Sequence, residues 1–311
     1  MPARPAPPSE ERDPDLAELL AEVRRIDVMS RRLVTDVMAG GWLSVFRGAG
    51  IEFDEVREYV EGDDPRAVDW SVTARMGRPF VKTYADEREQ TVLFLLDLSA
   101  SMTGGFGAWS ARQTAARVCA CLALAAARND DKVGLVAFSG GVDRFVPPKK
   151  GVGHVLRIVR DCLALPGREA RSDPAAALSM VTRAVRRRAV VFVVSDFLAG
   201  GWRTPLTLAA RRHDVIAVRL SSPELVLPDA GLVHLRDPET GVAHLVDTGS
   251  PAVRAAYAAR VAAWRAATDD AFRRARVDVL EVPVPRTPGP EAVAGPILAF
   301  FRMRDLRGAK R

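Results

Sequence analysis

The sequence predicts an α/β protein with a doubly wound, mostly parallel sheet. Apolar, strand-like runs alternate with helical patterns over 91–285, and this alternation is typical of a parallel sheet with helices on both faces. The runs are almost continuously apolar, as expected of strands that are buried on both sides. The strand-like runs are 91–97, 133–138, 190–194, 215–220 and 277–282, and the helical patterns are about 109–129, 151–165, 174–187, 202–212 and 250–275.

The segments before the alternating region are organised differently. Residues 1–12 are rich in proline and charge, which predicts a disordered tail. A helix is expected over 13–41, because Asp13 can cap it, Pro14 suits the first helical position and apolar residues follow at helical spacing. Residues 42–90 carry short aromatic-bearing segments broken by turn residues and dense in charge, which predicts a small strand-rich module.

Two further segments complete the predicted organisation. Residues 231–247 contain two short strand-like runs on either side of a turn at 237–241, which predicts a hairpin inserted into the sheet domain. Residues 286–311 are expected to form a C-terminal helix with a basic tail. The region 91–285 is therefore expected to be one domain that carries the hairpin.

Composition narrows the class of protein. The chain has 311 residues, of which 48% are hydrophobic, so a sizeable core is expected. The net charge of +6 comes mostly from dispersed arginines with few aromatics among them, which is weak support for a nucleic-acid surface. The three cysteines have no metal-ligand spacing and are expected to be reduced core thiols. With no long apolar run and no apolar leader segment, a cytoplasmic protein without a transmembrane helix is expected.

A candidate metal site follows the first strand of the predicted sheet. Asp97, Ser99 and Ser101 form a D-x-S-x-S pattern there, Asp196 ends another strand, and Ser172 lies just before a helix. Ligands of doubly wound sheets bind at the carboxyl ends of the strands, so the five side chains are expected to converge. Hard cations such as Mg²⁺ prefer oxygen ligands. The alternative is that the motif only caps the following turn, as Asp and Ser often do.

The chain resembles a known family. The region from 91 to about 285 is similar to a von Willebrand factor A-type domain, whose metal-ion-dependent adhesion site uses D-x-S-x-S, a later Thr and a later Asp. Several motifs in 46–102 resemble family fifty-eight of the bacterial domains of unknown function. They are Phe46-Arg47-Gly48-Ala49-Gly50, Glu52-Phe53, Arg57-Glu58-Tyr59, Glu61-Gly62-Asp63-Asp64-Pro65-Arg66, Asp69-Trp70 and Thr73-Ala74-Arg75.

The resemblance implies a set of metal ligands and a function. The ligands are Asp97, Ser99, Ser101, Ser172 and Asp196, with Ser172 in place of the usual Thr, and the ion is Mg²⁺, with Mn²⁺ or Ca²⁺ as alternatives. Such proteins are often encoded beside MoxR-type AAA+ ATPases, which implies an ATPase partner. The expected function is a non-enzymatic, metal-dependent protein-interaction module. It would be an adaptor in the assembly or remodelling of other complexes, with a client protein supplying an Asp or Glu to the metal.

Two alternative functions and one alternative role stay open. A metal-assisted phosphohydrolase also uses acidic residues at strand ends, although Ser99 stands where a dehalogenase-type phosphatase would have a second Asp. The basic tail 302–311 leaves a nucleic-acid-associated module as the other alternative, which salt-dependent binding would test. The charged segment 52–75 is either an internal ion-pair network or a partner surface.

Overall fold

The computed structural model describes residues 21, 51–61, 63–86, 90–103, 109–168, 171–287, 289 and 291–308. The predicted tail over 1–12 and, apart from the helical Ala21, the predicted helix over 13–41 lie outside these residues. The chain divides into two units, of which the smaller spans Phe46–Gln90 and the larger holds the rest. Among the described residues, no helix combines the length and apolar character that crossing a membrane requires.

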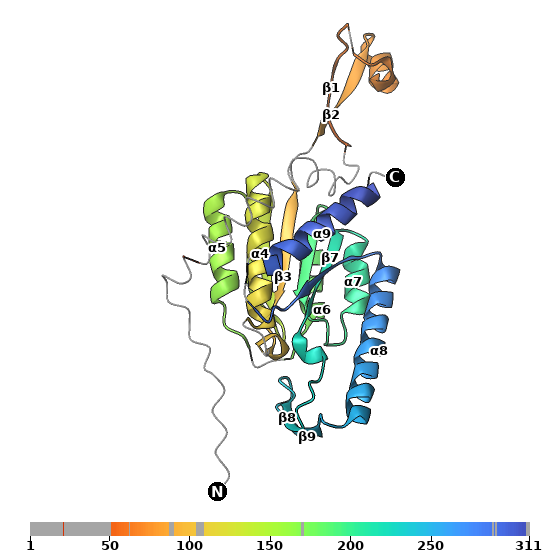
Figure 1. Ribbon diagram of the computed structural model, residues 1–311. Helices are drawn as coiled ribbons and strands as arrows, with labels where there is room; N and C mark the ends of the chain where they lie inside the picture. The colour runs from red at the N-terminus through yellow and green to blue at the C-terminus, as the bar shows by residue number, and fades with distance from the viewer. Residues whose placement is uncertain are drawn as a thin grey trace. The chain divides into compact units, whose positions relative to one another are not determined.

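A six-stranded sheet forms the centre of the larger unit, in the order β10-β7-β6-β3-β4-β5 (Figure 1). Neighbouring strands are parallel throughout, except that β5 runs antiparallel to β4. This arrangement confirms the predicted α/β class with a mostly parallel sheet. The strands are β3 (Thr91–Asp97), β4 (Lys132–Phe138), β5 (Val142–Lys149), β6 (Val190–Ser195), β7 (Asp214–Ser221) and β10 (Asp278–Pro283).

Helices cover both faces of this sheet (Figure 1). One face packs against α4 (Ala111–Arg128), beside which lie α5 (Val152–Ala164) and α9 (Glu291–Gly308). The other face packs against α6 (Pro174–Ala184), α7 (Arg203–Ala210) and α8 (Pro251–Ala275). The sheet is thus the middle layer of three, which explains why its strands are apolar along their whole length.

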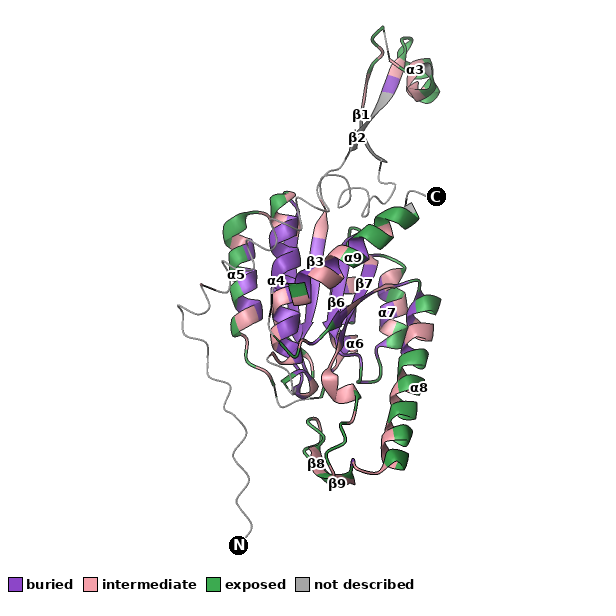
Figure 2. Cartoon of the chain, in the orientation of Figure 1, coloured by how far each residue is buried: buried purple, intermediate pink, exposed green. Residues whose placement is uncertain are grey.

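The central strand β3 is buried at every residue after Thr91 (Figure 2). Leu93 and Leu95 pack into the cluster formed with α6, α7 and α8. Phe94 points to the opposite face, where its ring stacks on that of Phe192 with the centroids 5.3 Å apart. Because side chains alternate along a strand, both faces hold β3 in place, and its last residue, Asp97, is delivered to a buried position.

The sequence did not predict the edge strand β5, but it did predict the hairpin. β5 contains Pro147 and Pro148, and the charged residues Asp143, Arg144 and Lys149 interrupt its apolar pattern; the prolines are tolerated because the strand lies at the sheet edge. The predicted hairpin is present as β8 (Leu232–Arg236) paired antiparallel with β9 (Ala243–Asp247), and it forms a separate two-stranded sheet.

The smaller unit is a hairpin with a short helix between its strands. β1 (Ile51–Glu58) pairs antiparallel with β2 (Phe80–Asp86), and the 3-10 helix η1 (Pro65–Ala67) and α3 (Trp70–Met76) lie between them in sequence. The carboxylate of Asp69 caps α3 by accepting hydrogen bonds from the backbone N–H groups of Ser71 and Val72. The prediction of a strand-rich module therefore missed α3, whose only sequence mark is this cap.

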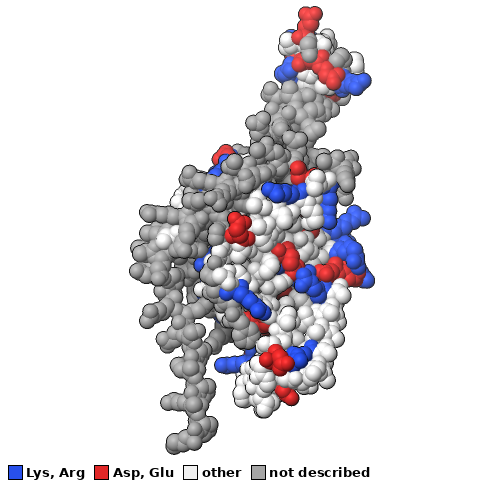
Figure 3. All heavy atoms as spheres, viewed as in Figure 1, with Lys and Arg blue, Asp and Glu red and all other residues white. Residues whose placement is uncertain are grey.

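Part of the basic charge is neutralised by ion pairs within each unit. In the smaller unit, Arg57 forms two hydrogen bonds with the carboxylate of Asp63, at 2.7 and 2.6 Å. In the larger unit, the buried Arg219 pairs with Asp269 and Glu281 at 2.7 and 2.8 Å. On the face drawn in Figure 3, acidic and basic side chains are interspersed. These arginines therefore serve intramolecular pairing within their own unit.

Candidate metal centre

Asp97 is the organising residue of the candidate site. It ends β3, is fully buried, and accepts three hydrogen bonds. Its Oδ1 accepts from the backbone N–H of Ser99 at 2.9 Å, and its Oδ2 accepts from the hydroxyls of Ser172 and Ser195, both at 2.7 Å. A buried carboxylate needs such partners to offset the loss of water. One side chain thereby joins the turn after β3, the start of α6 and the end of β6.

Asp196 supplies the second carboxylate. It directly follows β6, is 5% exposed, and accepts a hydrogen bond from the backbone N–H of Leu198 at 2.9 Å. Burial and the nearby negative charge of Asp97 raise the pKa of Asp196 to about 6, although a hydrogen bond from Ser101 opposes the shift. Burial also raises the pKa of Asp97, against its hydrogen bonds from Ser99, Ser195 and Ser172. The two carboxylates repel each other, and a bound cation would relieve that repulsion.

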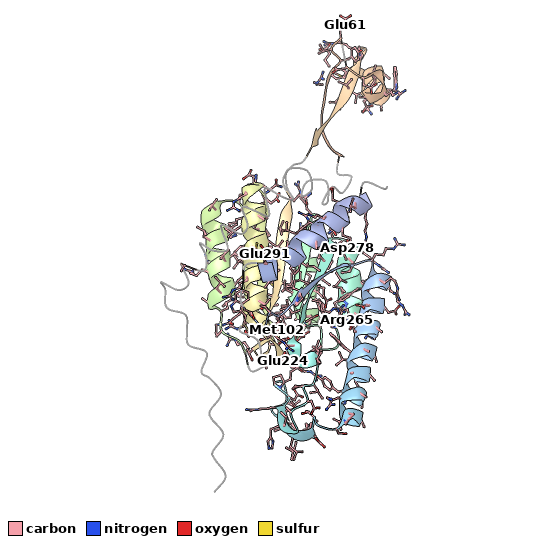
Figure 4. The ribbon with its side chains drawn as sticks, viewed as in Figure 1. Glu61, Met102, Glu224, Arg265, Asp278 and Glu291 are labelled. Atoms are coloured by element: carbon pink, nitrogen blue, oxygen red, sulfur yellow. The ribbon has the colours of Figure 1, made fainter. Side chains whose placement is uncertain are left out.

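Ser99 and Ser101 lie together at the turn after β3. Their hydroxyl oxygens are 3.3 Å apart, and Ser101 also hydrogen-bonds Asp196. The turn continues into the 3-10 helix η2 (Ala100–Thr103), in which the buried Met102 donates its backbone N–H to the carbonyl of Ser99 at 3.1 Å. Met102 is labelled in Figure 4 at the end of the sheet where this turn lies. The turn is thus held by the core, and its hydroxyls lie beside the carboxylates.

Ser172 is positioned by the loop between α5 and α6. The backbone N–H of Arg168 donates to the carbonyl of Leu98 at 2.8 Å, and that of Asp173 donates to the carbonyl of Ser139 at 2.7 Å. Asp173 then caps α6 by accepting from the backbone N–H of Ala176. These bonds tie the loop to the carboxyl edge of the sheet on both sides of Ser172. The five residues named from the sequence therefore lie in one place.

Ser195 belongs to the site although the sequence analysis did not name it. The register pairs Leu96 of β3 with Val194 of β6, so the next residues, Asp97 and Ser195, are neighbours across the two strands. The hydroxyl of Ser195 donates to Asp97 and accepts from the backbone N–H of Phe197 at 3.1 Å. Only the strand register shows this, because a serine at the end of an apolar run has no distinguishing spacing.

The capping alternative explains only part of this geometry. Asp97 does accept from the backbone of Ser99 through Oδ1, as a local cap would. Its Oδ2, however, accepts hydrogen bonds from the hydroxyls of Ser172 and Ser195, which are 75 and 98 residues away in sequence. A turn cap does not require these two bonds. The donor set of two carboxylates and three hydroxyls consists of hard oxygen atoms and fits Mg²⁺, Mn²⁺ or Ca²⁺. Among the described residues, no three His, Cys, Asp or Glu side chains gather into a metal cluster.

An open pocket of about 400 Å³ lies at the loop Phe197–Gly201, which directly follows Asp196 in the chain. The first residues of α7 and Trp264 and Thr268 of α8 also line it. The indole N–H of Trp264 donates to the carbonyl of Phe197 at 3.3 Å, and the ring of Phe197 packs edge-on against Trp202. Leu198 remains 49% exposed at this loop. The loop that follows Asp196 therefore borders a recess with both polar and apolar walls.

The fold and the site together define an α/β protein with a doubly wound sheet and an oxygen-only candidate cation site at the carboxyl ends of its strands. The family described as "Protein of unknown function DUF58" matches residues 55–267. The chain is 33% identical over 270 residues to the uncharacterized protein Rv1480 of Mycobacterium tuberculosis and to the uncharacterized protein Mb1516 of Mycobacterium bovis, with 85% of each chain covered. The chain belongs to the DUF58 family.

Two solved structures resemble this one at low identity. The conserved hypothetical protein BatB from Bacteroides thetaiotaomicron is 16% identical and has a TM-score of 0.42, with 71% of this chain and 100% of that chain covered. The VWA domain of SpRpn10 is 12% identical and has a TM-score of 0.37, with 67% and 93% covered.

Proposed function

We propose that this protein is a non-enzymatic, Mg²⁺-dependent protein-interaction module. The observation that carries the proposal is the buried Asp97, which gathers hydroxyls from two distant segments and lies beside a second buried carboxylate, Asp196. Ser99, Ser101 and Ser172 are neutral oxygen donors. With these hydroxyls bound directly and the carboxylates acting partly through water, a bound ion would keep much of its charge and would attract a further anionic oxygen.

A partner protein would supply that oxygen from an Asp or Glu side chain. The recess at the loop that follows Asp196 supports this proposal, because it offers Leu198 and the ring of Trp264 to residues that flank the partner's carboxylate. We further propose a MoxR-type AAA+ ATPase as the partner, with the protein as an adaptor in assembling or remodelling client complexes. This last step rests on the family resemblance described above.

The chemistry around Asp97 favours binding over catalysis. The hydroxyls of Ser172 and Ser195 both donate to the Asp97 carboxylate, so the acceptor that could activate either one is shared and buried. Ser99 occupies the position where a dehalogenase-type phosphatase would need its second Asp. The phosphohydrolase alternative would be supported by Mg²⁺-dependent turnover on a panel of phosphoesters that Asp97→Asn abolishes.

The test of the proposed function is partner capture by the tagged full-length chain from the native cell, in Mg²⁺ and in EDTA. Wild type, Asp97→Ala and Asp270→Ala are compared, the last removing a partly exposed aspartate of α8 that pairs with Arg273 and Arg274 on the same helix. We expect wild type and Asp270→Ala to capture the same ATPase in Mg²⁺, and Asp97→Ala to lose it. Capture that survives both EDTA and Asp97→Ala would refute metal-dependent docking.

A further inference from the structure

The β8–β9 hairpin carries a third carboxylate, Glu239, to the edge of the sheet where the candidate site lies. β3 ends at this edge with Asp97, and the hairpin lies beyond the same end of the sheet (Figure 1). Figure 4 places Met102, which belongs to the turn after β3, at this end as well. Glu239 is in the turn that joins β8 to β9, between Arg236 and Ala243.

The turn that holds Glu239 has a defined shape. The carboxylate of Asp237 accepts from the backbone N–H of Glu239 at 2.9 Å and from the hydroxyl of Thr240 at 2.8 Å. The backbone N–H of Gly241 donates to the carbonyl of Asp237 at 2.8 Å, and Gly241 has a φ of 70° that favours glycine. The side chain of Glu239 is 17% exposed, whereas Asp237 and Thr240 beside it are exposed. Glu239 is therefore covered while the rest of the turn faces solvent.

Arg171 links Glu239 to the candidate site. Its Nε lies 3.3 Å from Oε2 of Glu239, and the next residue in the chain, Ser172, donates its hydroxyl to Asp97. The negative charge of Glu239 is also among the causes that raise the pKa of Asp196, so the tip of the hairpin acts on the second carboxylate of the site. In the part of the chain that the structure describes, however, Glu239 does not lie close enough to Asp97 and Asp196 for the three carboxylates to hold one ion.

The hairpin is fixed at its base and lightly held along its length. At the base, the buried Thr248 donates its hydroxyl to the carbonyl of Gly231 at 2.8 Å, and Arg254 of α8 donates to the carbonyl of Thr248 at 2.6 Å. Most side chains of β8 and β9 are exposed or half-exposed, and the two strands pair only with each other. An isolated two-stranded hairpin has little stability of its own, so its tip can shift while its base stays in place.

We propose that Glu239 is an internal carboxylate that competes with the partner's Asp or Glu for the cation site. Without a cation, Glu239 pairs with Arg171, as it does here. When Asp97 and Asp196 hold a divalent cation, Glu239 would leave Arg171 and offer its carboxylate to the ion as a further ligand. A partner carboxylate then displaces Glu239, which returns to Arg171. The exchange replaces one carboxylate on the ion by another, so the charge of the site does not change. The proposal rests on the metal site of the proposed function.

The test uses Mn²⁺ as the probe with the protein described here. With this ion, both the binding affinity and the number of water molecules that stay on the bound ion can be measured. The variants are Glu239→Gln, Arg171→Gln and, as control, Asp229→Asn, which removes an exposed carboxylate that pairs with Arg254 at 3.2 Å near the hairpin base. Mn²⁺ affinity is measured by calorimetry, bound water by the relaxation of solvent protons, and access by titration with acetate. Thermal melting confirms that each variant is folded.

The proposal predicts opposite effects for the two members of the ion pair. Glu239→Gln should bind Mn²⁺ about tenfold more weakly. Removing a group that only supports a metal's ligands already lowers metal affinity by about 10- to 100-fold, and tenfold is the lower end of that range. It should also raise the proton relaxation of bound Mn²⁺ and admit acetate more readily. Arg171→Gln frees Glu239 for the ion and should bind Mn²⁺ more tightly with less bound water. Asp229→Asn should match wild type.

Two results would overturn the proposal, and a third would overturn the proposed function with it. If Glu239→Gln and Arg171→Gln change Mn²⁺ binding in the same direction, the pair is only structural. If Glu239→Gln matches Asp229→Asn, the hairpin does not reach the ion. If wild type binds no Mn²⁺, or binds it as well after Asp97→Asn, the cation site itself is refuted.

Discussion

The hydroxyl of Ser195 donates a hydrogen bond to Oδ2 of Asp97 at 2.7 Å, across 98 residues of sequence. The bond exists because β3 and β6 are parallel neighbours whose register brings the last residue of each strand together. Ser172 donates to the same oxygen from a loop outside the sheet. The carboxylate is thus oriented from two directions, which keeps its other oxygen toward the turn that carries Ser99 and Ser101.

Ser195→Ala should destabilise the protein by about 1–3 kcal/mol, because a buried carboxylate oxygen loses one of its donors. Urea unfolding followed by circular dichroism measures the change in the free energy of unfolding. The matched control is Ser179→Ala on the exposed face of α6, which should change it by less than about 0.5 kcal/mol. Equal effects of the two substitutions would contradict the role given to Ser195.

The stability of the metal-free protein should depend on Asp196 between about pH 4 and pH 7. The folded-state pKa of this group, about 6, is raised above its unfolded value, so its contribution is present at low pH and is lost as the pH rises through 6. In EDTA, the melting temperature of wild type relative to Asp196→Asn should therefore fall from pH 4.5 to pH 7.5. A pH-independent difference between the two proteins would exclude the raised pKa.

Added Mg²⁺ or Mn²⁺ should remove this loss of stability above pH 6. In the proposed site the ion would bind the ionised carboxylates of the folded state, so its affinity should rise as the pH increases through about 6. Calorimetric titrations with Mn²⁺ at pH 5.0 and pH 7.5 measure the change. Affinity that is the same at both pH values, or higher at pH 5.0, would argue against binding between Asp97 and Asp196.

Asp97→Asn should lower the pKa of Asp196. The charge of Asp97 is the second cause of the raised value, after burial, and the substitution removes it while leaving a side chain of the same size. Carboxyl carbon chemical shifts of Asp196, followed by NMR as a function of pH in wild type and variant, measure the difference. An unchanged titration would mean that burial alone sets the pKa of Asp196.

Phe94→Ala should destabilise the larger unit by about 3–5 kcal/mol, since it removes a fully buried ring that stacks on Phe192. Leu245→Ala, at an exposed position of the hairpin, should cost less than about 0.5 kcal/mol. Urea unfolding compares the two variants. A small cost at Phe94 would show that the core around β3 repacks, and would weaken the case that this strand positions Asp97.

The sequence was sufficient for those parts of the fold that leave a local pattern. Apolar runs marked β3, β4, β6, β7 and β10, and turn residues marked the β8–β9 hairpin. The edge strand β5 was missed because its prolines and polar residues conceal an extended segment that pairs on one side only. The helix α3 was missed because all of its described side chains lie outside the core, which leaves no apolar periodicity to detect.

The site was predictable as far as its residues end strands or begin helices. Asp97 and Asp196 each follow an apolar run, and Ser172 precedes the proline that starts α6. Ser195 and Glu239 were not predicted, because their roles depend on strand register in one case and on a contact with Arg171 in the other. Neither relationship has a spacing that the sequence alone displays.

The dependence of Asp97 on two distant hydroxyls also has a consequence for the protein's synthesis. A chain that has emerged from the ribosome only as far as α6 has Asp97 and Ser172 but lacks Ser195 and Asp196, and its β3 has no β6 to pair with. Such a nascent chain lacks both the Ser195 hydroxyl that orients Asp97 and the second carboxylate. The candidate site is therefore complete only after β6 has joined the sheet, and under the proposed function only finished chains would dock a partner.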